Sequence, residues 1–130
     1  MSRPGMRLIG LLAILMLCGV VGVRAADMSS LETQKIEFLL ASIEALQNAR
    51  FIRNGTAYDA KAASDHLRLK LSNAGSKVKS AEDFIRVCAS VSSLSGKPYL
   101  VRFSDGRQIT AEDYFNGKLR EYLHQIKHLE

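Results

Sequence analysis

Cysteine is scarce in this sequence, which contains only Cys18 and Cys88. Cys18 lies in an apolar N-terminal run, so removal of that run would leave Cys88 alone. A single cysteine cannot form an internal disulfide, even in an oxidising compartment. Cys88 lies in an apolar helical pattern beside Ile85 and Ala89, and we interpret it as a buried, inert thiol. A reactive thiol or an intermolecular bridge is the alternative.

Several short motifs of known chemistry are also missing. The sequence has no P-loop, no dinucleotide-binding glycine fingerprint, no Cys-x-x-Cys pair and no calcium loop. It also has no basic run dense enough to suggest nucleic-acid binding. Glu121, His124 and His128 have a spacing that could share a metal ion, but a helix would place them opposite its apolar stripe. We interpret them as a solvated face, and we expect no cofactor, no metal and no nucleic acid.

The N-terminus has the three parts of a secretory signal. Arg3 and Arg7 precede the apolar run LIGLLAILMLCGVVGV, and Val23-Arg24-Ala25 provides a small-residue cleavage site. The run is shorter than the about 20 residues that a membrane span needs. We predict a signal peptide at 1–25, a periplasmic mature protein and no membrane span after cleavage; an uncleaved anchor is the alternative.

Removing the signal changes the charge of the chain. The full sequence has 18 basic and 13 acidic residues, a net charge of +5. Without Arg3, Arg7 and Arg24, the basic residues fall to 15 and the net charge to +2. The basic character therefore belongs mostly to the targeting segment. The remaining 26–130 has the length of one small domain.

Four segments of the mature chain have the apolar spacing of helices. The first follows a capping box at Ser29 and Glu32. The second covers Ala60 to Asn73, the third begins after Ser80, and Thr110 caps the last. The predicted core is formed by the apolar residues on these helices: Ile36, Leu39, Leu40, Ile43, Leu67, Leu71, Phe84, Ile85, Phe115, Leu119 and Leu123. The first helix also has a second apolar stripe, which indicates either a central position or contact with a partner.

Two stretches, FIRNGTAYD at 51–59 and VRFSDGRQITAED at 101–113, have a similar pattern. In each, apolar residues precede an Asn-Gly or Asp-Gly pair, and a short return leads to a helix cap. Asn-Gly is typical of a type I′ hairpin turn, although Gly55 could instead end the first helix. We predict an α+β fold with four helices and one or two short antiparallel β-hairpins in a single small domain.

A group of polar residues at the ends of these elements forms the candidate binding site: Arg53, Tyr58, His66, Ser92, Ser93, Ser95, Gly96 and Tyr99. Loops on a rigid scaffold commonly carry binding. Arg53 is suited to a planar contact with a carboxylate, either internal, such as Asp59, or on a ligand. We expect a non-catalytic module that binds an envelope protein or peptide. The alternative is a small periplasmic hydrolase that uses His66 and a serine of the Ser92–Ser95 loop.

The same residues carry a family resemblance. The motif FIRNG at 51–55 is followed by Tyr58, by Ala62-Ala63 with His66-Leu67-Arg68 and Lys70-Leu71, by AEDFI at 81–85, by Ser92-Ser93, Ser95-Gly96 and Pro98-Tyr99, and by Asp105-Gly106. In this order the chain resembles the YfeK-like family of small exported bacterial proteins, a domain of unknown function. The resemblance covers nearly all of the mature chain and implies an exported bacterial protein. It supplies no catalytic residues, and Cys88, His124 and His128 are not part of it.

Overall fold

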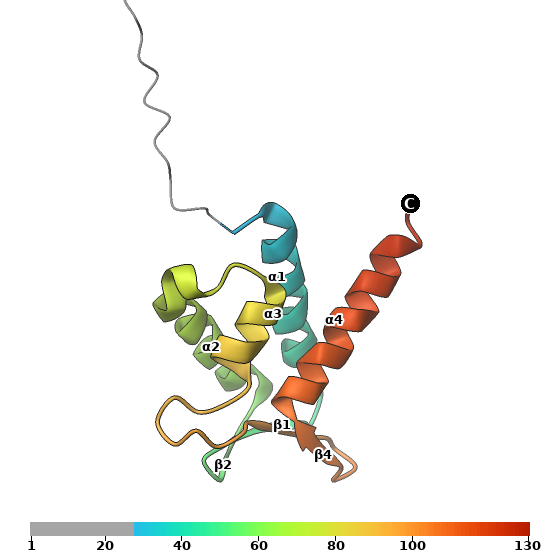
Figure 1. The fold of residues 1–130 in the computed structure, drawn as a ribbon. Helices are drawn as coiled ribbons and strands as arrows, with labels where there is room; N and C mark the ends of the chain where they lie inside the picture. Colours follow the sequence, from blue (N-terminus) through green and yellow to red (C-terminus); the bar gives the residue numbers. More distant parts are fainter. Residues whose placement is uncertain (1–27) are drawn as a thin grey trace, which may run out of the picture.

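The structure, a computed structural model, describes residues 28–130 (Figure 1). The elements in this range are α1 (Ser30–Glu44), β1 (Arg50–Arg53), β2 (Thr56–Tyr58), α2 (Ala60–Ala74), the 3-10 turn η1 (Gly75–Lys77), α3 (Ala81–Phe84), the π-helical turn η2 (Ile85–Ala89), β3 (Leu100–Arg102), β4 (Gln108–Thr110) and α4 (Ala111–Lys127). The predicted α+β fold is confirmed. The predicted signal peptide at 1–25 and Cys18 lie outside the described residues.

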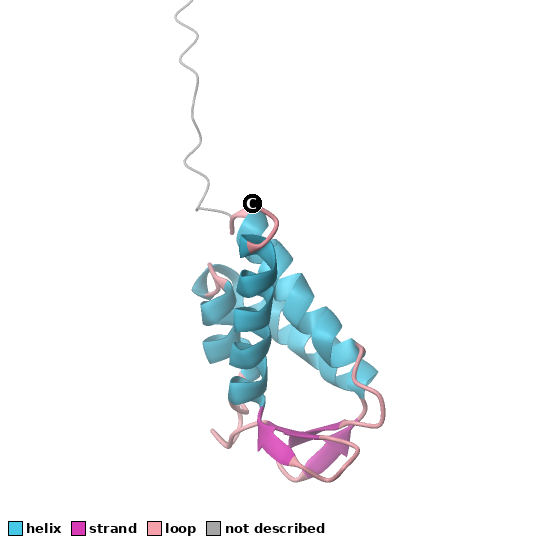
Figure 2. Ribbon diagram, turned by 90° about the vertical axis from the view of Figure 1, so that its right-hand side faces the viewer, coloured by secondary structure: helices cyan, strands magenta, loops and turns pink. Residues whose placement is uncertain are grey.

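The two hairpins join in one antiparallel sheet with the strand order β2-β1-β3-β4. Phe51 of β1 is opposite both Tyr58 of β2 and Val101 of β3. Phe51 and Val101 are buried, and the helices lie on their side of the sheet (Figures 1 and 2). Because side chains alternate along a strand, Ile52 and Leu100 point to the opposite side. The sheet is therefore covered by helices on one face only.

The two hairpin turns differ in conformation. Asn54 and Gly55 both have positive φ, +50° and +78°, as a type I′ turn requires. The first stretch is therefore a hairpin, and Gly55 does not end the first helix. In the second hairpin the backbone N–H of Phe103 donates to the carbonyl of Arg107. This hydrogen bond encloses a turn of three residues, of which Gly106 has a φ of +87°. The Asp-Gly pair is thus not equivalent to Asn54-Gly55, because its turn contains one more residue.

The core lies between the covered face of the sheet and the four helices. Nine of the eleven predicted core residues are buried, while Leu71 is partly buried and Leu123 is 38% exposed. Leu123 was predicted wrongly, because α4 leans away from α2 and α3 toward its C-terminal end (Figure 1). The second apolar stripe of α1 packs within the fold only in part: the Phe38 ring lies 4.9 Å from that of Tyr122 on α4, whereas Ala41 and Ala45 are exposed. Cys88 is buried at 1% exposure, as predicted, and burial raises the pKa of its thiol.

The predicted capping box at the start of α1 forms only in part. Ser29 Oγ accepts a hydrogen bond from the backbone N–H of Glu32 at 3.3 Å. The Glu32 carboxylate does not close the box; it accepts hydrogen bonds from Lys35 Nζ at 2.7 Å and from the Ala81 N–H at 2.7 Å. Ala81 is the first residue of α3, so Glu32 satisfies a free N–H at the start of that helix and joins it to α1.

Glu32 is expected to make the stability of the fold depend on pH. Burial acts to raise the pKa of Glu32, but the hydrogen bonds from Lys35 and Ala81 outweigh it, and the pKa lies below 4.5. A lowered folded-state pKa gives stability that is fully present above pH 4.5 and is lost as pH falls through the folded-state value. Glu32→Gln should therefore reduce the free energy of unfolding by about 1–2 kcal/mol at neutral pH.

Urea denaturation of both proteins over an acidic pH series measures this effect. The difference between wild type and Glu32→Gln should shrink as pH falls below 4.5. Glu82→Gln is the matched control, because Glu82 lies exposed on the first turn of the same α3 helix. A difference that stayed constant down to the lowest pH would show that the charge of Glu32 has no part in stability.

Candidate functional site

Four of the predicted site residues meet between the covered face of the sheet and α2. Arg53 ends β1 and Tyr58 ends β2, while His66 lies in the middle of α2. Tyr99 precedes β3, where its N–H donates to the carbonyl of Ser90 and its carbonyl accepts from Ala111. Asp59, at the start of α2, caps this helix by accepting from the N–H of Ala62. Asp59 is therefore not the partner of Arg53 that the sequence suggested.

Arg53, His66 and Tyr99 form a chain of polar contacts. Nη1 of Arg53 lies 2.9 Å from Nδ1 and 3.0 Å from Nε2 of His66, and Nε2 lies 3.2 Å from the hydroxyl of Tyr99. The Arg53 guanidinium also lies over the ring of Tyr58, 5.3 Å from its centre. A guanidinium can only donate, so one of the two His66 nitrogens must be unprotonated to accept its hydrogen bond.

Lys70 completes the cluster, although it is not among the residues of the predicted binding site. Its Nζ donates to the Tyr99 hydroxyl at 3.1 Å and to the carbonyl of Val91 at 3.0 Å. Val91 comes shortly after the π-helical turn η2 in the chain. Ser90 ends that turn, and its hydroxyl donates to the carbonyl of Ile85. One signal was available in the sequence: Lys70 lies four residues after His66, on the same side of α2.

The surroundings of His66 favour the neutral imidazole. Burial lowers the pKa of His66, and the positive charges of Arg53 and Lys70 lower it further. The hydrogen bonds of His66 include no carboxylate that would oppose this shift. We infer that His66 acts at neutral pH as a hydrogen-bonding group without charge, between two cations.

The two cations of this cluster have no counter-charge within residues 28–130. Six other basic side chains in that range form ion pairs, among them Lys35, Arg68 and Lys118, but Arg53 and Lys70 form none. The cluster therefore has an excess of positive charge next to a partly buried, neutral imidazole. Such an excess attracts an anion.

A pocket lies directly beside Arg53. It has a volume of about 140 Å³, and its lining is formed by Phe51, Arg53, Tyr58, Ala62, Ala63 and His66. The apolar walls come from β1 and α2, while the polar groups are Arg53, Tyr58 and His66. This combination of an apolar wall with a few polar groups is typical of a site for a small ligand.

The serines of the predicted site belong to a different cluster. Asn54, at the tip of the first hairpin, donates from Nδ2 to the hydroxyl of Ser92 at 3.1 Å, and its Oδ1 accepts from Ser95. Gly96, with a φ of +69°, donates from its N–H to the carbonyl of Ser92 and closes the loop. Ser93 is exposed and lies with Lys70 at the edge of a shallow hollow. Asn54 was missed as a member of this cluster, because its turn geometry already explained it.

These contacts do not assemble the parts of a serine hydrolase. The hydrogen-bond partners of His66 are Arg53 and Tyr99, and none of the three loop serines is among them. A nucleophilic serine needs a base within hydrogen-bonding reach, and the base is usually oriented by a third group such as a carboxylate. The geometry therefore gives no support to the hydrolase alternative.

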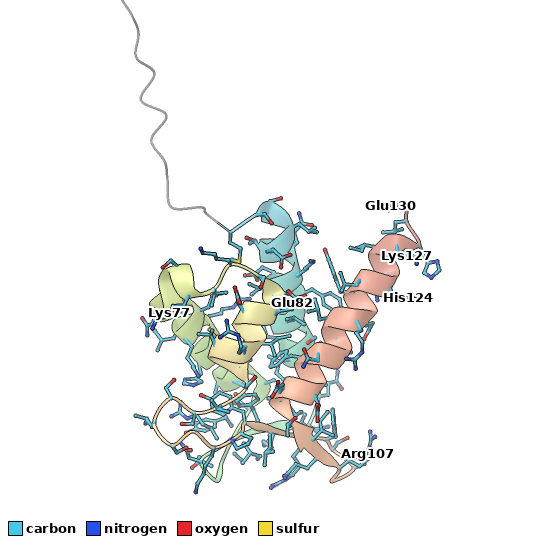
Figure 3. The ribbon with its side chains drawn as sticks, in the orientation of Figure 1. Lys77, Glu82, Arg107, His124, Lys127 and Glu130 are labelled. Atoms are coloured by element: carbon cyan, nitrogen blue, oxygen red, sulfur yellow. The ribbon has the colours of Figure 1, made fainter. Side chains whose placement is uncertain are left out.

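The C-terminal histidines lie far from this cluster. Figure 3 shows His124, Lys127 and Glu130 near the free end of α4, at the opposite end of the molecule from the hairpin tip at Arg107. The Nε2 atoms of His124 and His128 lie 3.1 Å apart, and both residues are exposed. They lie on the solvated face that the sequence predicted.

Removing the charge of Arg53 is expected to raise the pKa of His66. The positive charge of Arg53 is one of the causes that lower this pKa, so Arg53→Gln removes part of the shift. NMR titration of the His66 ring protons measures the change, and Lys61→Gln, on an exposed part of α2, is the control. An unchanged pKa would mean that burial and Lys70 keep His66 neutral without a contribution from Arg53.

Comparison with known proteins places the chain among proteins of unassigned activity. Residues 30–123 match a family described as "Family of unknown function (DUF5329)". The chain is also 39% identical over 74 residues to the "Uncharacterized protein YfeK" of Salmonella typhimurium, an alignment that covers 57% of this chain and 62% of the relative. No solved structure matches. The resemblance noted in the sequence is confirmed, and the chain belongs to the DUF5329 family of unknown function.

Proposed function

We propose that this chain is an exported, non-catalytic binding protein of the bacterial envelope, and that its ligand presents a carboxylate to the pocket beside Arg53. Export is supported by the N-terminal pattern of residues 1–25. Within residues 28–130, no helix has the length and apolarity that crossing a membrane requires. The ligand is an envelope protein or peptide, because a chain exported to the periplasm meets such molecules and rarely meets nucleic acid.

The observation that carries the proposal is the unpaired positive charge of Arg53 in the lining of the pocket, to which Lys70 adds a second unpaired cation in the same polar cluster. Arg53 is half-buried, so its guanidinium is held in place while one side of it faces the pocket. The Tyr58 ring packs against the Arg53 guanidinium, and the Tyr99 ring meets the His66 ring edge to face. A carboxylate in the pocket would accept hydrogen bonds from Arg53. It would also neutralise part of the combined positive charge of Arg53 and Lys70.

A binding role agrees better with these contacts than a catalytic one. The lone pair of the His66 nitrogen next to Arg53 is occupied by the guanidinium, which opposes its use as a general base. The side chains of Ser92 and Ser95 hold the loop to Asn54. A preorganised pocket with fixed donors requires no further chemistry to hold an anion.

The test is an NMR titration with two forms of one peptide. Acetylated trialanine with a free C-terminal carboxylate is compared with the same peptide carrying a C-terminal amide. The free acid should shift the signals of His66 and Arg53 and should raise the pKa of His66, because it offsets the cations that lower this pKa. The amide should cause neither change.

Variants identify the groups responsible for binding. Arg53→Gln should weaken binding of the free acid by about 10–100-fold, since it removes a charged hydrogen bond. Arg86→Gln is the control, because Arg86 is exposed and pairs with Asp83 away from the pocket. Equal shifts with the acid and the amide, or no shift with either, would reject the carboxylate site.

Export is tested separately from ligand binding. The mature protein recovered from the bacterial envelope should begin at Ala26 when its mass is measured. A chain that retains Met1, or a mature form acylated at Cys18, would contradict the predicted cleavage site.

A further inference from the structure

The uncovered face of the sheet is a second surface with unusual chemistry. We call it the outer sheet face and define it by the outward side chains of Arg50, Ile52, Leu100 and Arg102. These residues alternate with the buried Phe51 and Val101, and they pair across β1 and β3 as Arg50 with Arg102 and Ile52 with Leu100. Figures 1 and 2 show that the helices lie on the other side of the sheet. The outer sheet face is therefore open to a partner.

Positive charge on this face is not balanced. The four strands contain no aspartate and no glutamate. Arg50 is directly opposite Arg102, and like charges in that position destabilise a sheet. Arg50 donates to the carbonyl of its neighbour Ala49, and Arg102 donates to Gln108. Neither arginine forms an ion pair within the described part of the chain.

An apolar hollow lies next to the two arginines. Its volume is about 390 Å³, and its lining is formed by Ile52, Asn54, Gly55, Lys97, Pro98 and Leu100. Lys97 adds a third cation at the border of the face. Ile52 is only 7% exposed, so it forms the floor of the hollow and does not protrude. The face thus combines an apolar depression with Arg50 and Arg102 at one end and Lys97 at the other.

We propose that the outer sheet face binds an acidic, extended segment of a partner protein. Carboxylates of the segment would pair with Arg50 and Arg102, and one of its apolar side chains would fill the hollow over Ile52 and Leu100. An acidic residue and an apolar residue two positions apart suit this arrangement, because side chains two apart in an extended segment lie on the same face, as Arg50 and Ile52 do on β1.

Charge and shape distinguish this occupant from two others. A second copy of the chain would bring Arg50 and Arg102 against the same arginines, which opposes a symmetric dimer through this face. A lipid surface requires apolar side chains that protrude into it, whereas Ile52 and Leu100 lie in a depression. The unbalanced charge and the hollow together favour an acidic protein segment.

The probe for the test is a fluorescent decapeptide in which pairs of glutamates alternate with pairs of leucines, so that each face of the extended peptide carries both residue types, with an acetylated N-terminus and an amidated C-terminus. The amide removes the terminal carboxylate, and Arg53→Gln should leave binding of this peptide unchanged, which separates the outer sheet face from the pocket beside Arg53. Fluorescence anisotropy should show binding at about 20 mM NaCl that weakens at about 200 mM, because screening reduces the attraction. The same decapeptide with lysine in place of glutamate should not bind.

Charge reversal locates the binding face. The double variant Arg50→Glu/Arg102→Glu should weaken binding of the acidic peptide at least about 10-fold, while Arg86→Glu, on the exposed side of η2, should leave it unchanged. Equal loss in both variants, or no binding by the wild type, would overturn the proposal. Binding of wild type to phosphatidylglycerol vesicles without binding to the peptide would overturn it in favour of a lipid surface.

A stability measurement on the free protein provides independent support. Arg50→Gln removes one of two like charges that face each other, so its melting temperature should rise by about 1–4 °C at low salt. The same variant should bind the acidic peptide less tightly. A residue that lowers stability and increases binding is the pattern expected of an interaction site. A lower melting temperature for Arg50→Gln would mean that Arg50 has a structural role in the sheet.

Discussion

Replacing Tyr99 with alanine is expected to lower the free energy of unfolding by about 3–5 kcal/mol. The Tyr99 ring is 1% exposed and packs against the ring of Phe51 at 5.1 Å between centres and against His66 at 6.0 Å. The substitution removes this ring and leaves a cavity between the sheet and α2. Urea denaturation, followed by circular dichroism, measures the loss.

Tyr99→Phe separates the hydroxyl from the ring. It keeps the packing but removes the oxygen that accepts from Lys70 and contacts His66, so its cost should be about 1 kcal/mol. Lys70 retains the carbonyl of Val91 as an acceptor. If Tyr99→Phe destabilised the protein as much as Tyr99→Ala, the polar contacts, and not the packing, would be the main contribution of Tyr99.

Replacing Asn54 with alanine is expected to lower the free energy of unfolding by about 2–4 kcal/mol, for two reasons. Asn54 has a φ of +50°, which costs a residue with a β-carbon roughly 1–2 kcal/mol unless a local side-chain bond favours it. Its side chain also bonds Ser92 and Ser95 and thereby holds the loop at 92–96 to the tip of the first hairpin. Each of these bonds contributes about 1 kcal/mol.

Asn54→Gly is the matched control for the backbone conformation. Glycine adopts a positive φ without cost, so this variant loses only the bonds to Ser92 and Ser95 and should cost about 1–2 kcal/mol. Hydrogen exchange should show faster exchange at Gly96 and Lys97 in both variants, because their N–H groups bond within the loop. Unchanged exchange there would show that the hairpin tip does not hold the loop.

The first β-strand separates the two proposed binding surfaces. Arg53 lies on the covered side, where it reaches the pocket beside α2, and Arg50 lies on the outer sheet face. The two peptide-binding experiments therefore test opposite faces of one sheet. Only the trialanine probe for the pocket has a free terminal carboxylate. Ligand binding at one surface does not require the other, so each proposal can fail alone.

Local signals in the sequence predicted the elements well. Polar caps at Ser29, Asp59, Ser80 and Thr110 each accept a hydrogen bond at the start of the expected helix. Asn54-Gly55 predicted the first hairpin, because only a few residue types adopt two consecutive positive φ values at low cost. Apolar spacing identified most of the core on the helices. All of these features depend on residues that are close in the chain.

The candidate site was predicted only in part, for a physical reason. Selecting the residues near the ends of helices and strands identified Arg53, Tyr58, His66 and Tyr99. The same selection also included Ser92, Ser93, Ser95 and Gly96. Which of these residues meet depends on the pairing of β1 with β3, which are separated by more than 40 residues and brought together by packing. That pairing places Tyr99 beside His66, whereas Ser92 and Ser95 form hydrogen bonds with Asn54.

The sequence by itself determined the helix starts, the first turn, the α+β class and the family resemblance, because each follows from short-range geometry or from motifs in order along the chain. The tertiary structure alone decided that both hairpins form one sheet, that Lys70 joins the cluster of Arg53 and His66, and that Glu32 bonds to α3 instead of completing its own cap. It also placed Arg50 opposite Arg102. These features depend on strand register and on the packing of distant elements, and the free energy that selects them comes from burial of the whole core.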